Sequence, residues 1–375
     1  MIYLDCAATS FQKPKTVYAA VQQAMHTMSS PGRGGYGPAM KAADTAYACR
    51  EAVQELFHVP EPEQVVFTCN ATHALNLAIH GLVSPQSRVV VSGYEHNSVM
   101  RPLHHIGAEL SMVSTPLFDP DAMLRGFAEA LPGADVCICT GMSNVFGYGP
   151  PIEAIGALCR VHGVKYIVDA SQLAGCGRLD FGTLGADFVA MPGHKGLLGP
   201  QGTGILLCRE PLPPLMQGGT GSDSAIAYMP DYLPDGLEAG THNIPGLAGL
   251  LAGVQYVLRR GTKHLAAHEK HMEALFLDRL KQDPKWEIFT DAQGKTDGAV
   301  VSLRYPGVDC EDLASALGKS GVCVRAGLHC APFAHKTAGT FSTGTVRFSF
   351  SPFICANEAN LTAEITKRCV NNLKI

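Results

Sequence analysis

Residues 135–169 read DVCICTGMSNVFGYGPPIEAIGALCRVHGVKYIVD, and this stretch decides the fold class. Two short apolar runs, 135–140 and 165–169, have the length and the content of Val, Ile and Cys that are typical of buried strands. Between them, residues 152–162 carry apolar side chains at helical spacing. A strand, a helix and a second strand in this order predict two parallel strands joined by a helical crossover.

The same alternation extends in both directions from this stretch. Further buried strands are expected at 64–68, 88–92, 109–113 and 187–191. Residues 204–208 form one more apolar run, but the connection that precedes it is rich in Gly and Pro and has no helical period, so this strand is expected to run antiparallel. The sequence therefore predicts an α/β fold in which a seven-stranded, mostly parallel sheet is flanked by helices.

The pattern changes after about residue 250. A long helical stretch at 247–280 is expected first. Strands at 299–304, 322–325 and 345–350, and helices at 311–319 and 357–371, are expected to follow. This order predicts a smaller α+β domain. We therefore expect a large domain at 15–250 and a small C-terminal domain at 251–375, joined by the N-terminal segment 1–14.

Composition and charge exclude several classes of protein. Of 375 residues, 46% are hydrophobic and 17% are charged, as in ordinary globular proteins. The net charge of −4 gives no electrostatic basis for binding nucleic acid or an anionic membrane. The N-terminus lacks the features of a signal peptide, and no apolar run approaches the ~18 residues of a membrane span. We expect a cytoplasmic protein that binds neither nucleic acid nor membranes, with most of its 13 cysteines serving as packing residues.

Polar residues follow five of the predicted strands at their carboxyl ends, where open α/β sheets bind ligands. Thr72 and nearby N–H groups at a helix start suit a phosphate. Asp169 ends a buried strand and requires a cationic partner, such as a pyridinium nitrogen. Lys195, between glycines, could form a Schiff base, and His96 could lie against an aromatic ring. Each has an ordinary explanation alone, as a cap, a turn residue or a solvated lysine, but together they predict a pyridoxal phosphate site.

Several phrases of the sequence resemble the class V aminotransferase family, within the fold-type I pyridoxal phosphate enzymes. They are LDCAAT at 4–9, FTCNATHALN at 67–76, EHNS at 95–98, SNV at 143–145, VDASQ at 168–172, GHK at 193–195, EAGT at 238–241 and RAGLHC at 325–330. Within that family, the sequence is similar to the cysteine desulfurases whose catalytic cysteine lies in an Arg-x-Gly-x-His-Cys segment. The resemblance extends from the first residues to about residue 350.

The resemblance implies a role for each matching residue. Lys195 would hold the cofactor covalently and remove the α-proton of the substrate, while His96 stacks on the ring. The remaining cofactor contacts would come from Ala71, Thr72, Asp169, Gln172 and His194, and from Thr241 of a neighbouring subunit. A homodimer with shared active sites is therefore implied. The substrate would bind through Asn144, Arg325 and Arg347. Cys6 and Pro192 depart from the family wording, which usually has Asn and Ser or Thr at these positions.

Cys330 is the predicted sulfur carrier. The thiolate is the nucleophilic form of cysteine, and Arg325 and His329 lie close to Cys330 in a segment whose Gly and Pro are typical of an exposed loop. By the family resemblance, Cys330 would take sulfur from L-cysteine as a persulfide, release alanine and pass the sulfur to an acceptor protein. A metal site built from His329, Cys330 and His335 would have only three ligands, so no metal is expected.

Three alternatives stay open beside a cysteine desulfurase that supplies sulfur for iron–sulfur clusters or other thio-cofactors. A selenocysteine lyase acting on L-selenocysteine shares the fold and the cofactor. A class V aminotransferase acting on a small amino acid needs no nucleophilic thiol, so Cys330 argues against it. A regulatory protein that binds the cofactor would show no turnover.

Overall fold

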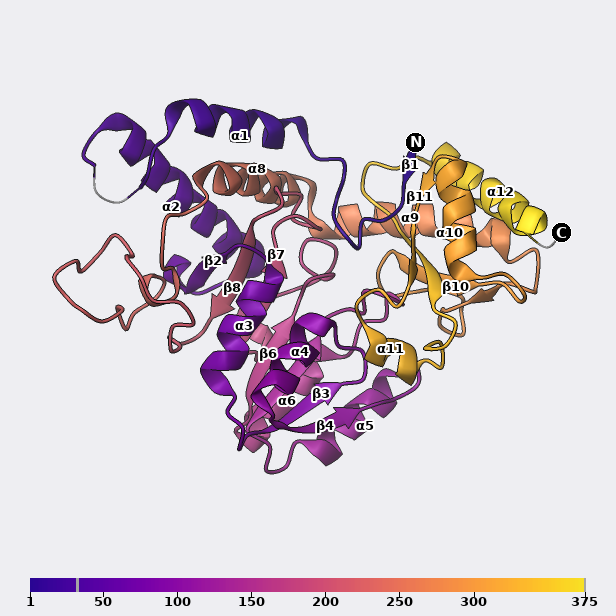
Figure 1. Ribbon diagram of the computed structural model, residues 1–375, viewed down its shortest axis with the longest axis horizontal. Coiled ribbons are helices and arrows are strands. Elements are labelled where there is room, and N and C mark those ends of the chain that lie inside the picture. Colours follow the sequence, from indigo (N-terminus) through magenta and orange to yellow (C-terminus); the bar gives the residue numbers. More distant parts are fainter. Residues whose placement is uncertain (32–33, 374–375) are drawn as a thin grey trace.

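The computed structural model describes residues 1–31 and 34–373, so positions 32, 33, 374 and 375 of the two predicted domains lie outside the described residues. Seven strands form its main sheet (Figure 1). They are β2 (Val65–Thr68), β3 (Arg88–Ser92), β4 (Glu109–Val113), β5 (Val136–Thr140), β6 (Lys165–Asp169), β7 (Phe188–Pro192) and β8 (Gly204–Cys208). Their order is β2-β8-β7-β6-β5-β3-β4, and β8 runs antiparallel to both of its neighbours. The predicted mixed sheet, including its antiparallel strand, is confirmed.

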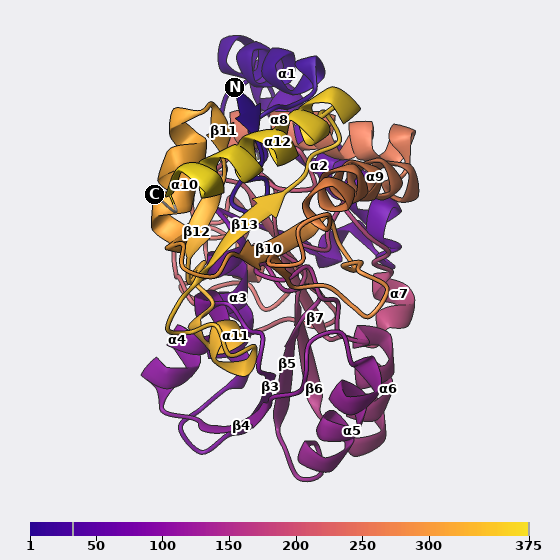
Figure 2. The same cartoon turned by 90° about the vertical axis from the view of Figure 1, so that its right-hand side faces the viewer.

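Helices bury both faces of this sheet (Figure 2). On one face lie α3 (Ala71–Leu82) and α4 (Asn97–Ile106). On the other lie α2 (Gly37–Phe57), α5 (Pro120–Ala130), α6 (Ile152–His162), α7 (Phe181–Leu184) and α8 (Ile244–Arg260), and α1 (Lys15–Thr27) packs against α8. Strands covered on both faces read as continuous apolar runs, which is why the sequence pattern located them.

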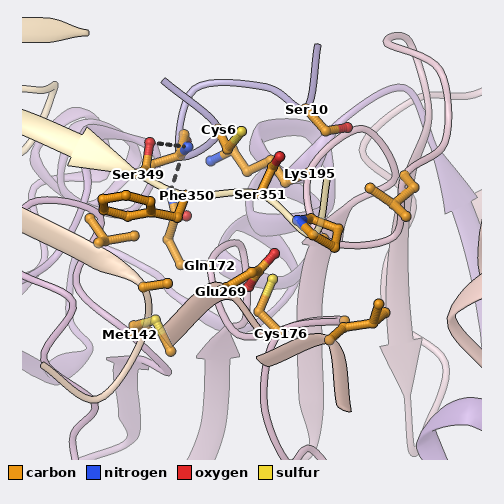
Figure 3. A pocket seen from close by; sticks show the side chains of 18 residues that line it. Cys6, Ser10, Met142, Gln172, Cys176, Lys195, Glu269, Ser349, Phe350 and Ser351 are labelled. Carbon is orange, nitrogen blue, oxygen red and sulfur yellow. Dashed lines mark hydrogen bonds between the residues drawn. The ribbon is translucent and has the colours of Figure 1, made fainter. Parts of the chain in front are cut away.

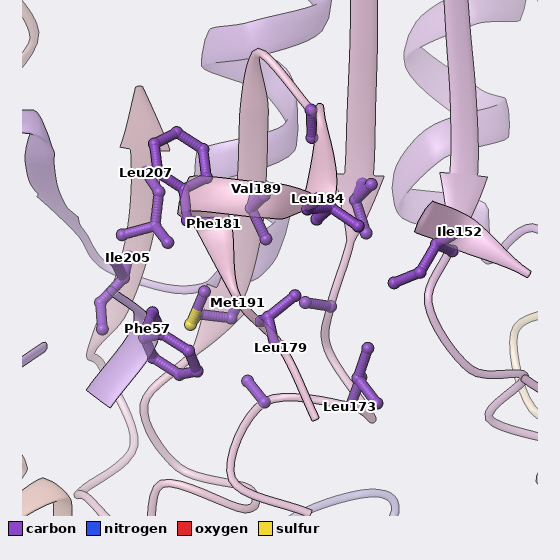
Figure 4. Close-up of a cluster of buried hydrophobic side chains, with 14 of the residues drawn as sticks. Phe57, Ile152, Leu173, Leu179, Phe181, Leu184, Val189, Met191, Ile205 and Leu207 are labelled. Carbon is purple, nitrogen blue, oxygen red and sulfur yellow. The ribbon is translucent and has the colours of Figure 1, made fainter. Parts of the chain in front are cut away.

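Side chains along each strand alternate between the two cores. In β5, Val136 and Ile138 belong to the cluster beneath α3 and α4, whereas Cys137 and Cys139 belong to the cluster on the other face. Both cysteines are fully buried, which confirms that they are packing residues. Figure 4 shows part of the second cluster, in which Phe181 lies over strands β7 and β8.

A second set of strands forms beyond α8. The four-stranded sheet has the order β12-β13-β10-β9, with β9 (Glu287–Ile288), β10 (Val300–Arg304), β12 (Arg325–Gly327) and β13 (Thr345–Ser349). Helices α9 (Thr262–Leu280), α10 (Cys310–Lys319) and α12 (Ala356–Leu373) enclose its core. The N-terminal strand β1 (Ile2–Tyr3) pairs in parallel with β11 (Val322–Cys323), so the first residues of the chain belong to this second unit. The domain boundary at residue 250 stays a prediction.

Three local predictions for this part of the chain are wrong. The single helix expected at 247–280 is two helices, because Gly261 between α8 and α9 has φ +80°, outside the helical range. The strand expected at 322–325 is divided between β11, which pairs with β1, and β12, which pairs with β13. A short helix, α11 (Pro332–Thr337), lies where a loop was expected, with Pro332 in its first turn.

Two short 3₁₀ helices, η1 (Pro62–Gln64) and η2 (Asp235–Leu237), complete the described elements. None of the helices within 1–31 and 34–373 is both long and apolar enough to span a bilayer.

The close contact of α6 with the α7 region gives a stability prediction. A Cβ atom on Gly156 would lie 2.2 Å from the backbone oxygen of Leu184, so Gly156→Ala must push α6 away and is expected to destabilise the fold by about 1–3 kcal/mol. A Cβ atom on Gly318, in α10, would meet no neighbouring atom within 4 Å. Gly318→Ala is therefore expected to raise the free energy of unfolding by about 0.5–1 kcal/mol. Urea unfolding followed by circular dichroism would measure both. If both substitutions changed the free energy of unfolding in the same direction, this account of α6 packing would be contradicted.

Candidate active site

A cavity of about 600 Å³ lies at the carboxyl edge of the main sheet. The residues that line it follow β2, β3, β5, β6 and β7, the five strands after which polar residues were predicted to gather. Eight predicted site residues line it: Ala71, Thr72, His96, Asn144, Asp169, Gln172, His194 and Lys195. Pro192 lies in the same wall.

One wall of the cavity is the start of α3. Asn70 caps this helix by accepting a hydrogen bond from the His73 N–H, while the N–H groups of Ala71 and Thr72 precede the first hydrogen bond within the helix. The Thr72 hydroxyl also lies 2.8 Å from the hydroxyl of Ser98. Backbone N–H groups and hydroxyls at a helix N-terminus form a site suited to a phosphate.

The imidazole of His194 also lines the cavity. Its Nδ1 shares a hydrogen bond of 2.9 Å with the Thr9 hydroxyl. Burial, followed by the charge of Lys195, lowers the pKa of His194 to about 4, so the ring is neutral near pH 7. His194 can therefore contribute a neutral hydrogen bond to a bound anion.

His96 and Asp169 present different chemistry to the cavity. The Nδ1 of His96 accepts the Ser98 N–H at 3.0 Å, and burial lowers the pKa of His96 to about 4, so the ring is neutral with its proton on Nε2. Asp169 is 3% exposed at the end of β6, and its carboxylate accepts the Ser171 N–H at 2.9 Å. A carboxylate this buried suits a cationic ring nitrogen as its partner.

Lys195 separates this cavity from a second one and lines both. Burial lowers the pKa of Lys195 to about 8, although the charge of Asp169 opposes this shift. About one tenth of the amine is therefore unprotonated at pH 7, and the unprotonated form is the one that attacks a carbonyl carbon.

The second cavity, of about 590 Å³, lies between the N-terminal segment and α9 (Figure 3). Glu269, Cys6 and Cys176 point into it. Burial raises the pKa of Glu269 to about 8 and that of Cys6 to about 12, and it raises the pKa of Cys176 further above its usual value. These groups are therefore predominantly uncharged near neutral pH, so they leave the Lys195 ammonium without a compensating negative charge on this side.

Arg347 lies behind the cavity wall and is 1% exposed. Its Nη2 donates to Asp5 at 2.6 Å, and its Nη1 donates to the backbone oxygen of Asn144 at 3.0 Å. Its Nε has no hydrogen-bond partner among the described residues. The Asn144 amide donates to the backbone oxygen of His329 at 2.8 Å. Arg347 and Asn144, which were predicted to bind the carboxylate of the substrate, thus already form hydrogen bonds with other parts of the chain.

Cys330 is exposed, and its loop is held against the cavity. The N–H of Asn97, at the start of α4, donates to the Cys330 oxygen at 2.8 Å. His329 and Cys330 have φ of +51° and +56°, a left-handed conformation that non-glycine residues rarely adopt in succession. The Nη2 of Arg325 lies 4.0 Å from the Cys330 sulfur, where it can balance negative charge on that atom.

His329, which lies close to Cys330 in the sequence, does not supply a positive charge beside the thiol. His329 is 4% exposed, and burial together with Arg347 lowers its pKa well below the usual value. Its ring bonds the Arg325 oxygen at 3.2 Å and His335 at 3.3 Å, and His335 in turn bonds Thr340 at 2.7 Å. His329 therefore fastens the loop. In the described part of the chain, no three His, Cys, Asp or Glu side chains are grouped as metal ligands.

Besides Arg347 and Cys330, two further predicted residues do not line the cavity of their own chain. Thr241 is exposed and lines a separate hollow beside Phe67 and His73, and Arg325 contacts the Cys330 sulfur instead. Three other residues, Asp5, Thr9 and Ser98, contact Arg347, His194 and His96 but were given no role from the sequence. Asp5, Thr9 and Ser98 belong to the phrases that carry the family resemblance, which was the available signal.

Glu95 lies directly beneath the site and precedes His96. Its Oε1 accepts hydrogen bonds from the Ser92 hydroxyl and, at 2.7 Å, from the Thr140 N–H, and it thereby joins the ends of β3 and β5. Its Oε2 has no partner among the described residues. Burial raises the pKa of Glu95 from 4.5 to about 8.

This shift predicts a pH-dependent stability. Because folding favours the protonated acid, the contribution of Glu95 to stability is complete below pH 4.5 and is lost as the pH rises through about 8. The glutamine of Glu95→Gln is neutral at every pH, so the variant does not lose this stability as the pH rises. The free energy of unfolding of the variant minus that of the unmodified protein is therefore expected to increase by a few kcal/mol between about pH 5 and about pH 9. Chemical denaturation at each pH measures the difference, with exposed Glu129→Gln as the control. A difference independent of pH would show that Glu95 is ionised in the fold.

Comparisons with known proteins agree with this architecture. The family model for aminotransferase class-V matches residues 2–361. A probable cysteine desulfurase of Methanothermobacter thermautotrophicus is 32% identical over 97% of this chain and 93% of its own length. A cysteine desulfurase of Klebsiella pneumoniae is 30% identical over 88% of this chain and 84% of its own. The apo structure of cysteine desulfurase from Thermococcus onnurineus superposes with a TM-score of 0.89 at 28% identity, covering 99% of this chain and 95% of that one. The chain belongs to the class V aminotransferase family, and within that family it is similar to the cysteine desulfurases.

Proposed function

We propose that this chain is a pyridoxal phosphate-dependent cysteine desulfurase that converts L-cysteine to L-alanine and keeps the sulfur as a persulfide on Cys330. The observation that carries the proposal is the position of the Cys330 loop. Asn144, which lines the cavity, donates to the His329 oxygen, and Asn97, which follows His96, donates to the Cys330 oxygen. Among the described residues, the exposed thiol held in this way lines a hollow that shares Thr72, His96 and Ser98 with the cavity of Lys195 and Asp169.

The lining residues fit pyridoxal phosphate. Ala71, Thr72 and His194 would hold its phosphate, Asp169 its ring nitrogen and Gln172 its ring hydroxyl, while His96 would lie against the ring. When bound, the cofactor withdraws electrons from the α-carbon of an amino acid. The Lys195 amine, whose pKa is lowered to about 8, would hold the cofactor covalently and accept the α-proton of the substrate.

Arg347 and Asn144 would bind the carboxylate of the substrate. Arg347 is buried, and its Nε has no hydrogen-bond partner in the part of the chain that the structure describes, so a carboxylate can pair with it strongly. Gln172 is oriented by the hydrogen bond from its amide to the Ala7 oxygen, at 2.9 Å. Arg325 would act on the sulfur atoms, since its guanidinium faces Cys330.

Cys330 would then remove the substrate sulfur. As the thiolate attacks, a sulfur–sulfur bond forms and the carbon–sulfur bond of the substrate breaks. The electron pair of the broken bond stays with the carbon skeleton, which takes up protons and leaves as alanine. The guanidinium of Arg325 balances the charge on the sulfur.

A cytoplasmic homodimer with shared sites is also part of the proposal. Thr241 is exposed and distant from its own cavity, as expected of a residue that completes the phosphate site of a partner. The segment between β8 and α8 projects from the body (Figure 1) and exposes apolar side chains such as Ile226 and Tyr228. All thirteen cysteines are free, in keeping with a reducing compartment. The acceptor protein would receive this sulfur for iron–sulfur clusters or other thio-cofactors.

Cys330→Ala tests the sulfur step. Loss of the nucleophile is expected to lower alanine formation from L-cysteine by about 100-fold or more while cofactor binding persists. Brief exposure of the unmodified protein to L-cysteine should add one sulfur to the Cys330 peptide, as measured by mass spectrometry. Cys355→Ala, at another exposed cysteine, is the control. Full L-cysteine activity in Cys330→Ala would refute the persulfide step, and turnover confined to L-selenocysteine would identify a lyase instead.

Lys195→Ala tests the cofactor attachment. Hydride reduction of the loaded protein should leave the cofactor mass on the Lys195 peptide, and this adduct should be absent from Lys195→Ala. Lys13, whose pKa burial also lowers to about 8, provides a matched control. Lys13→Ala should retain the adduct. An adduct that survives in Lys195→Ala would show that another amine holds the cofactor.

A further inference from the structure

A second hollow opens outward from Cys330. It lies along α3 and α4 and is lined by Asn76, His80, Arg101 and His105. Thr72, His96 and Ser98 line both this hollow and the inner cavity, so the two are contiguous. The hollow therefore leads from solvent to the sulfur atom and on to the cofactor site.

Three segments meet around this opening. Helices α3 and α4 pack against each other, the Asn97 N–H holds the Cys330 carbonyl, and the His104 ring stacks on Phe333 of α11 with 6.0 Å between centroids. Figure 1 shows α4 and α11 side by side in front of the main sheet.

These segments carry positive charge and no negative charge. The chain has 33 acidic residues, yet 71–82, 97–106 and 325–349 contain no Asp or Glu. They do contain Arg101, Arg325 and Lys336, all exposed, together with exposed histidines at 80, 104 and 105. Neither Arg101 nor Arg325 forms an ion pair with a carboxylate in the described part of the chain. The Glu311 carboxylate of α10 lies beside Gly327, but the residues around the thiol are predominantly cationic on a protein whose net charge is −4.

We infer that this opening docks a protein acceptor whose own reactive cysteine is flanked by carboxylate side chains. The inference rests on the proposed function and specifies the partner of the same site. The acceptor thiolate would attack the outer sulfur of the Cys330 persulfide. A new sulfur–sulfur bond forms on the acceptor, the old one breaks, and Cys330 leaves as a thiolate beside Arg325. No oxidant or reductant is consumed. Charge complementarity steers such a partner to the opening and raises its rate of association.

Peptide acceptors of opposite charge test this inference. Each peptide has a central cysteine between two glycines, flanked on both sides by two glutamates or by two lysines. The protein is loaded with L-cysteine, and the sulfur gained by each peptide is measured by mass spectrometry. The rate at which each peptide takes sulfur from the protein is divided by the rate at which the same peptide takes sulfur from a small-molecule persulfide. This ratio corrects for the different intrinsic reactivity of the two peptide thiols. The acidic peptide is expected to react about 10-fold faster, and about 0.5 M KCl should remove most of the difference.

Charge reversal on the protein supplies the matched variants. Arg101→Glu should lower the preference for the acidic peptide at least about fivefold, without changing alanine formation in the presence of dithiothreitol. Exposed Arg125→Glu on α5 should leave the preference unchanged. His105→Glu reports on the same surface if Arg101→Glu does not fold.

The outcomes separate the inference from the function on which it rests. Equal rates for the two peptides, or equal effects of Arg101→Glu and Arg125→Glu, would overturn the inference while alanine formation continues. Absence of alanine formation in the unmodified protein would overturn the proposed function itself.

Discussion

The arrangement of the two sheets around the site depends on the buried guanidinium of Arg347. A buried charge without partners costs several kcal/mol, so Arg347 requires the groups that satisfy it. These groups come from distant parts of the chain: Asp5 from the N-terminal segment and the Asn144 oxygen from the loop after β5. Arg347 itself belongs to β13 of the smaller sheet. The Ala7 N–H, which donates to the Ser349 hydroxyl at 2.9 Å, reinforces the same junction.

Asn144 extends this junction to the reactive loop. Its oxygen accepts from Arg347 and its amide donates to the His329 oxygen, so one residue contacts both the predicted carboxylate site and the segment that carries Cys330. The neutral pair of His329 and His335 holds the other side of the loop. These hydrogen bonds offset the strain of two successive left-handed residues, which costs on the order of 1–3 kcal/mol for each.

Much of the fold could be predicted because its signals are local. Strands buried on both faces are continuous apolar runs, and polar residues at their carboxyl ends mark the edge where eight predicted residues now line one cavity. The rest depends on contacts between distant segments. The division of 322–325 into two strands follows from pairing with β1, and the cavity of Cys6, Cys176 and Glu269 joins three separate stretches. The neutral, buried state of His329 could not be predicted either, because sequence proximity to Cys330 says nothing about burial.

The antiparallel strand β8 has an electrostatic consequence. Strands β2 and β3 lead directly into α3 and α4, whose N-termini carry partial positive charge toward the cavity. The chain between β7 and β8 turns back without a helix, and Lys195 lies in this return. Lys195 therefore does not precede a helix N-terminus on its own strand, whereas the start of α3 offers its partial positive charge to an anion. Reversing one strand thus separates anion binding from amine chemistry.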